Sequence, residues 1–142
     1  MLVTLIGTIL VLLICCLTVL SSGPISAFIY LPSLITVVLI TTAGLIAGHG
    51  LWAPLRLLQA ALVGPRGPLA PLQAQVSTAR RLAWSSAVFA TVVSGHGIIQ
   101  VYDDPTAFAP ALSVLFLPLV YTAILDVVVL APLQGRLAVA PE

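Results

Sequence analysis

Charged residues are scarce in this chain. Only 6% of its 142 residues are charged, whereas 61% are hydrophobic and the mean hydropathy is +1.22. Soluble domains carry about 25% charged residues, so this chain has too little polar surface to cover a globule in water. A net charge of only +1 also argues against binding to the phosphates of nucleic acids. The composition predicts one domain whose solvent is lipid.

Residues that build catalytic and metal sites are equally few. The two cysteines, Cys15 and Cys16, are adjacent in an apolar run, and neighbours on a helix point in different directions, so no disulfide is expected between them. No pair of ligand-type residues has the spacing of a metal site. Ser-His-Asp, Cys-His and glycine-rich phosphate-binding patterns are absent from the sequence. We therefore expect no enzyme activity, no metal and no cofactor.

Long apolar segments dominate what is present. Four of them cover residues 2–21, 33–51, 82–101 and 108–132. Each is close to the ~20 residues that cross a hydrocarbon core of ~30 Å as a helix. Backbone groups cannot stay unpaired in lipid, and the alternation typical of membrane barrels is absent. The sequence predicts an all-α integral membrane protein with four transmembrane helices, the first of them a retained span because residues 1–22 carry no charge.

The arginines indicate the orientation. Four lie between the second and third spans and one follows the fourth span: Arg56, Arg66, Arg80, Arg81 and Arg136. The positive-inside rule then places both termini and a short loop, residues 52–81, in the cytoplasm. Residues 51–62 are expected to extend the second helix into water, and residues 73–81 to begin the third helix. The apolar connection 22–32 is too short to span, so we expect it along the outer interface.

Two motifs resemble the flagellar stator A subunits of the MotA family, relatives of the TolQ/ExbB proton channels. The stretch from Pro24 to Leu34 is similar to the family's interfacial helix and the start of its second span. The stretch from Tyr102 to Val114 resembles its outer turn into the fourth span. That turn and the positions in register after it include Asp103, Asp104, Pro105, Tyr121, Pro132 and Arg136. The resemblance covers the four spans but not the family's large cytoplasmic domain, which the loop 52–81 replaces.

The resemblance implies a bacterial inner-membrane protein that forms a ring, a pentamer in the family, around two single-span partners like MotB. In the family, an aspartate of this B-type partner carries ions and the ring turns. Threonines on the third and fourth spans, and a proline at the inner start of the third, help to form the ion path. Thr91 matches the third-span threonine, whereas Trp84 stands at the proline position. Pro118 and Leu119 replace the fourth-span hydroxyl pair, and Thr122 is close by.

Asp126 is the acid inside the predicted fourth span, and family members do not usually carry one there. Such an acid costs roughly 2.5–3.5 kcal/mol in lipid, so it normally faces protein or water. It stays ionised only where a cation or several donors are near. Asp126 either faces a pore, as an ion-path candidate with Thr91, Thr122 and Tyr121, or is a neutral or hydrogen-bonded carboxyl. In the second case it fixes the packing of subunits or reaches toward the inner surface.

Other polar groups also have two interpretations. His96, between two glycines, is either buried against neighbouring backbone or part of a water-linked relay to Asp126, about 10 Å away along the membrane normal. Thr91 and Thr122, expected at similar depths, either bond their own backbone or line a polar path. The turn Asp103-Asp104-Pro105 either caps the fourth helix or gathers cations.

Two main functions remain open. One is a ring-forming subunit of a MotA-like ion-driven motor or channel, and the other is a non-conducting structural membrane protein with the same fold. The replaced hydroxyls and the missing inner proline favour the second, because the family's ion path uses these groups. A small four-span transporter would normally place an acid early in the chain, and the first two predicted spans have none.

Overall fold

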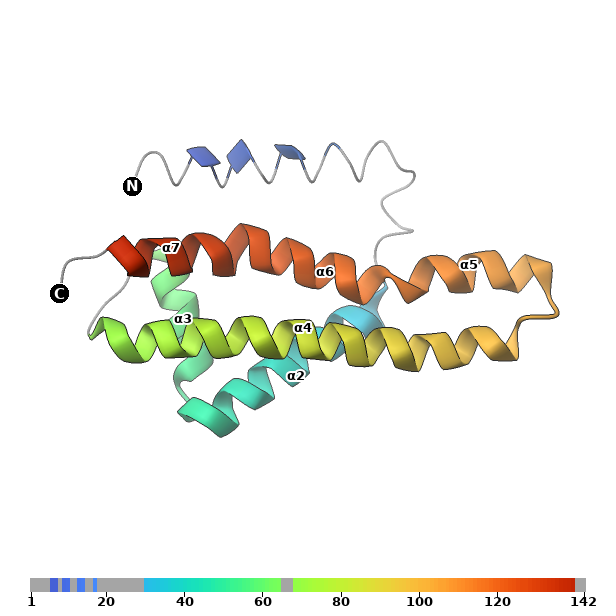
Figure 1. Cartoon of the computed structure of the whole chain (residues 1–142), viewed down its shortest axis with the longest axis horizontal. Coiled ribbons are helices and arrows are strands. Elements are labelled where there is room, and N and C mark those ends of the chain that lie inside the picture. The colour runs from blue at the N-terminus through green and yellow to red at the C-terminus, as the bar shows by residue number, and fades with distance from the viewer. Residues whose placement is uncertain are drawn as a thin grey trace.

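The computed structural model describes residues 30–64 and 68–139, together with positions 6, 7, 9, 10, 13, 14 and 17. Over these residues the chain forms helices and no strands, as the sequence predicts (Figure 1). Three described helical segments are long and apolar enough to cross a membrane: Leu31–His49, Leu69–Gln100 and Pro105–Ala138. The rest of the predicted span 2–21, and residues 22–29 of the predicted interfacial connection, lie outside the described residues. The described part therefore supports three candidate spans, not four.

The second apolar segment forms α2 (Leu31–His49), which includes the last two residues of the predicted connection 22–32. Pro32 fits at its start because the N–H groups of a first turn have no partner within the helix. The helix ends at Gly50, whose φ of 88° is readily adopted only by glycine. The chain turns there and begins a separate helix, α3 (Ala53–Leu62). The expectation that residues 51–62 prolong the second helix is therefore wrong, although most of them are helical.

The longest helix is α4 (Leu69–Gln100), whose 32 residues extend about 48 Å at 1.5 Å per residue. It begins well before the predicted third span, so the second half of the predicted loop 52–81 is continuous with that span. Antiparallel to α4 runs a nearly straight series of shorter helices (Figure 1). These are α5 (Pro105–Leu115), α6 (Leu117–Leu125), the π-helical turn η2 (Asp126–Leu130) and α7 (Ala131–Val139).

Prolines account for the divisions in this series. Pro118 has no N–H to give to the carbonyl of Val114, and the helix is interrupted at Phe116, between α5 and α6. The N–H of Ala131 donates to the carbonyl of Asp126, five residues back, which is the bond of a π turn. Pro132 follows directly and could not give a normal helical bond to Val128. Single π turns are frequent at functional sites, and this one begins at the buried acid.

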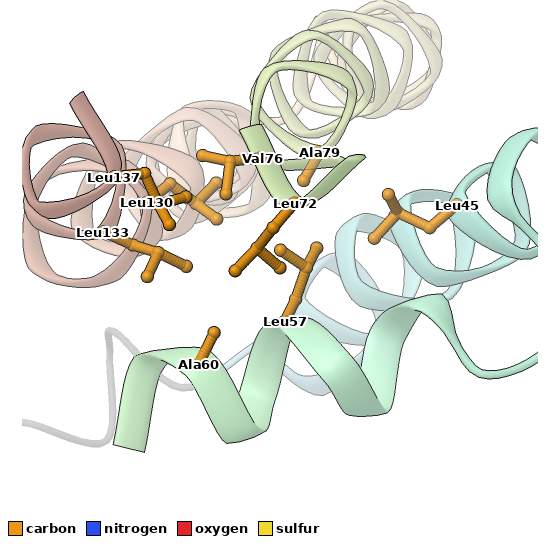
Figure 2. Packing of buried hydrophobic residues seen from close by; sticks show 9 residues of the cluster. All are labelled: Leu45, Leu57, Ala60, Leu72, Val76, Ala79, Leu130, Leu133 and Leu137. Carbon is orange, nitrogen blue, oxygen red and sulfur yellow. The ribbon is translucent and has the colours of Figure 1, made fainter. Parts of the chain in front are cut away.

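The hydrophobic core lies at the end of the molecule where α4 begins and α7 ends. Its nine buried residues come from α2, α3, α4, η2 and α7 (Figure 2): Leu45, Leu57, Ala60, Leu72, Val76, Ala79, Leu130, Leu133 and Leu137. Because α3 contributes two of them, it is packed against the bundle rather than extended into solvent. Next to Leu45 on α2, a Cβ added to Gly44 would lie 2.7 Å from Cδ1 of Leu82, so α2 and α4 approach closely there.

Candidate functional site

A charged cluster joins α4 to the π turn. Arg80 and Trp84 are four residues apart and therefore share one face of α4. Arg80 donates from Nε to Oδ1 of Asp126 at 2.7 Å and from Nη2 to Oδ2 at 3.0 Å. Trp84 donates from Nε1 to Oδ2 at 3.2 Å. Arg80 also donates from Nη1 to Oε1 of Gln134 on α7, so one guanidinium links three helical elements.

Burial determines what this carboxylate can do. Asp126 is only 7% exposed, whereas the side chain of Arg80 is 37% exposed at the rim of the cluster. Both carboxylate oxygens accept charge-assisted bonds in a two-pronged pairing, which is the strong geometry for arginine and a carboxylate. A charge that costs several kcal/mol to bury is thus compensated inside the chain. Asp126 thus links the π turn to α4 through these bonds. A carboxylate that faces a pore would instead be exposed to water.

The numbers of residues that separate Arg80 and Asp126 from the turn Asp103-Asp104 could have predicted this pair, although Arg80 was expected in the loop 52–81. Arg80 lies 23 residues before Asp103, and Asp126 lies 22 residues after Asp104. Two antiparallel helices of equal rise that meet at this turn place both residues at the same depth. The long side chain of arginine then reaches a carboxylate on the neighbouring helix.

The other ion-path candidates do not form one site with Asp126. Thr122 is fully buried, and its hydroxyl donates to the carbonyl of Ala83 at 3.4 Å. The hydroxyl of Thr91 is buried without a hydrogen-bond partner in the described part of the chain. Thr91 lies 12 residues before Asp103 and Thr122 18 residues after Asp104, a difference of about 9 Å along the helices. The expectation of similar depths is therefore wrong.

Tyr121 belongs to a different contact. Its hydroxyl accepts a bond from the backbone N–H of Tyr30 at 2.8 Å. This bond ties the residue before α2 to α6 across 91 positions of sequence. At the other end of α2, Nε2 of His49 lies 3.0 Å from the hydroxyl of Thr78 on α4. Both ends of α2 are thus joined to the α4–α6 pair by polar contacts.

His96 lies away from the cluster and is exposed. It follows Trp84, which contacts Asp126, by 12 residues on α4, or about 18 Å along the axis. The gap between His96 and the Asp126 cluster is therefore larger than the 10 Å expected between His96 and Asp126. A Cβ added to the neighbouring Gly95 would lie 3.6 Å from Leu115, so this glycine, and not the histidine, faces α5. The interpretation of His96 as a buried packing residue does not fit this exposed position.

The outer turn is a helix cap. Oδ1 of Asp104 accepts bonds from the N–H of Thr106 at 2.9 Å and from its hydroxyl at 2.6 Å. Pro105 occupies the first turn of α5, and Asp103 is exposed beside it. The bonds from Thr106 hold the pKa of the Asp104 carboxyl below its ordinary value of 3.8. Asp104 therefore stabilises the start of α5 in its ionised form.

This cap predicts a pH dependence. Because the pKa of Asp104 is lower in the folded state, its contribution to stability is present above about pH 4 and is lost as the pH falls through the lowered value. Asp104→Ala should therefore lower Tm at pH 7 and have less effect at pH 3. Thermal unfolding followed by circular dichroism at both pH values measures this. Asp103→Ala is the control, and an effect of Asp104→Ala that grows with acidity would contradict the cap.

No family model, curated protein or solved structure matches the chain. Within the described ranges, no group of three His, Cys, Asp or Glu side chains is arranged to hold a metal ion. Fold and site together define a helical protein with three described membrane-length helices and a buried Arg80–Asp126 pair near one end.

Proposed function

We propose that this chain is a ring-forming subunit of a MotA-like complex, surrounding a B-type partner whose membrane aspartate carries the ion. The observation that supports it best is the long antiparallel pair of α4 with α5–α7, joined by the turn that carries the resemblance. On this pair, Thr91 occupies the position that matches the family's third-span threonine. Its buried hydroxyl has no hydrogen-bond partner in the described chain, and such a group gains free energy from a water, an ion or a neighbouring subunit.

The distribution of charge supports cytoplasmic termini. Arg80, Arg81 and Arg136 belong to the end where α4 begins and α7 ends, and Arg56 lies on α3, which packs against that end. The acidic turn Asp103-Asp104 lies at the opposite end of α4. With the positive-inside rule, the hydrophobic core faces the cytoplasm and the acidic turn faces outward, in a bacterial inner membrane.

A second candidate is a non-conducting structural subunit with the same fold. Trp84 stands where the resembled family has a proline, and Asp126 has no counterpart in that family. These two departures contact each other through the bond from Nε1 to Oδ2, and Arg80 completes the contact. A fixed ion pair in place of the family's inner proline favours a subunit that keeps the assembly but conducts no ions.

Coexpression with a single-span partner that carries a membrane aspartate tests both candidates. We expect a complex with more copies of this chain than of the partner, measured by native mass spectrometry. In proteoliposomes with a proton or sodium gradient, Thr91→Val should lower ion flux about tenfold. Thr36→Val is the matched control, because the Thr36 hydroxyl already bonds the carbonyl of Pro32 in its own helix.

Three outcomes separate the candidates. Flux that depends on Thr91 and on the partner's aspartate supports the ion-driven subunit. A stable complex of unequal stoichiometry without flux supports the structural subunit. Recovery of this chain only as a monomer, in every mild detergent and in nanodiscs, contradicts the ring in both forms.

A further inference from the structure

An apolar groove runs between α3 and the helices that follow the buried acid. Two cavities of about 230 Å³ each share four lining residues: Leu58, Ala61, Val129 and Leu133. The first cavity extends along α2 to Thr41 and Thr42, and the second ends at Arg136. The shared residues make the two cavities one continuous surface, which leads from the middle of α2 to the last turn of α7.

The two edges of α3 differ in polarity, and this difference indicates on which side of α3 the lipid lies. Leu55, Leu58 and Leu62 form an exposed apolar edge, and Leu62 is 77% exposed. The other edge carries Arg56 and Gln59, which line a separate polar cavity of about 440 Å³. A helix with one apolar and one polar edge lies in the plane of a membrane interface. The groove is therefore on the hydrocarbon side of α3, and the polar cavity is on the water side.

Arg136 places a cation at one end of the groove. Its Nε is buried without a hydrogen-bond partner, and its guanidinium forms no ion pair within the described ranges. This contrasts with Arg80, whose guanidinium is paired with Asp126. An unpaired guanidinium at a membrane interface favours a phosphate, because its planar donors match two phosphate oxygens.

We propose that the groove binds an anionic phospholipid, with the phosphate at Arg136 and an acyl chain along Leu58, Ala61 and Val129 toward Thr41. The residues that line the groove are apolar except for Thr41 and Thr42 at the α2 end and Arg136 at the inner end. That combination fits the two parts of a lipid in the cytoplasmic leaflet, where basic pockets between helices take anionic head groups. All lining residues belong to one copy of the chain, so the site does not need the proposed partner, whereas its place in the cytoplasmic leaflet rests on the orientation proposed above.

Native mass spectrometry of the isolated, delipidated protein tests the site. It is titrated with dioleoyl phosphatidylglycerol, with dioleoyl phosphatidylcholine and with inorganic phosphate. We expect phosphatidylglycerol to bind at least fivefold more tightly than phosphatidylcholine. Arg136→Gln should remove this preference, whereas Arg56→Gln, a matched loss of charge on the polar edge of α3, should retain it. Ala61→Phe fills the groove and should weaken binding of both lipids.

A second measurement uses the unaltered protein, in case a variant fails to fold. Phosphatidylglycerol with a diazirine in its acyl chain should form adducts within residues 58–61 and 129–133. Equal affinity for the two lipids, or equal losses in Arg136→Gln and Arg56→Gln, would overturn the proposal. Full competition by inorganic phosphate would make the site a free-phosphate site, and crosslinks to a second copy in place of lipid would make the groove a subunit interface. Either result rejects the lipid.

Discussion

Replacing Asp126 with Asn is expected to lower the free energy of unfolding by about 2–3 kcal/mol. The substitution keeps the size of the side chain but removes the charge that compensates Arg80. It also breaks at least one of the three hydrogen bonds, because the amide nitrogen of Asn cannot accept. Breaking a fully buried pair costs about 3–5 kcal/mol. The expected value is lower here because the side chain of Arg80 is 37% exposed, so its surroundings screen the charge.

A double variant tests whether Arg80 and Asp126 act as a pair. Arg80→Met with Asp126→Leu removes both charges and fills the site with apolar side chains, so most of the lost stability should return. Unfolding in mixed micelles with increasing sodium dodecyl sulfate, followed by circular dichroism, measures Asp126→Asn, Arg80→Met, Asp126→Leu and the double variant. Thr36→Val serves as an unrelated polar substitution. If the double variant were as unstable as the sum of the single ones, the two residues would not act as a pair.

Local chemistry explains which parts of the fold were predictable. The helices could be predicted from the lengths of the apolar segments, because a backbone in lipid must pair its own N–H and C=O groups and a helix does so. The break at Pro118 follows from residue type, because proline cannot continue the helical hydrogen bonds. The break at Gly50 was missed, although glycine readily adopts the positive φ found there. The separate direction of α3 was missed because it depends on how Leu57 and Ala60 bury against α4 and α7, which no local pattern states.

The candidate site was only partly predictable for a similar reason. Asp126 stood out because an acid in an apolar run is costly. Its partner Arg80 did not stand out, because it is 46 positions away in the sequence and was assigned to the loop 52–81. Thr91 and Thr122 were placed at one depth by counting from separate span ends. Counting both from the shared outer turn reveals the Arg80–Asp126 pair and separates the two threonines.

Truncating Leu137 to alanine is expected to lower the free energy of unfolding by about 2–4 kcal/mol. Leu137 is 1% exposed in the cluster that joins α3, α4 and α7, so the lost methyl groups leave a cavity among its neighbours (Figure 2). The cost arises from lost packing, which holds membrane helices together even where lipid is as apolar as leucine. The backbone carbonyl of residue 137 still accepts the bond from Nε2 of Gln73, so the substitution isolates the side chain.

The matched control is Leu39→Ala on α2, where the leucine is 61% exposed and alanine loses contacts only with the surroundings. Both variants are measured by the same mixed-micelle unfolding. Leu137→Ala should shift the midpoint strongly and Leu39→Ala by little. Equal shifts would mean that the hydrophobic core adds no more to stability than a surface leucine does. α3 would then be held by contact of its apolar edge with the membrane interface rather than by packing against α4 and α7.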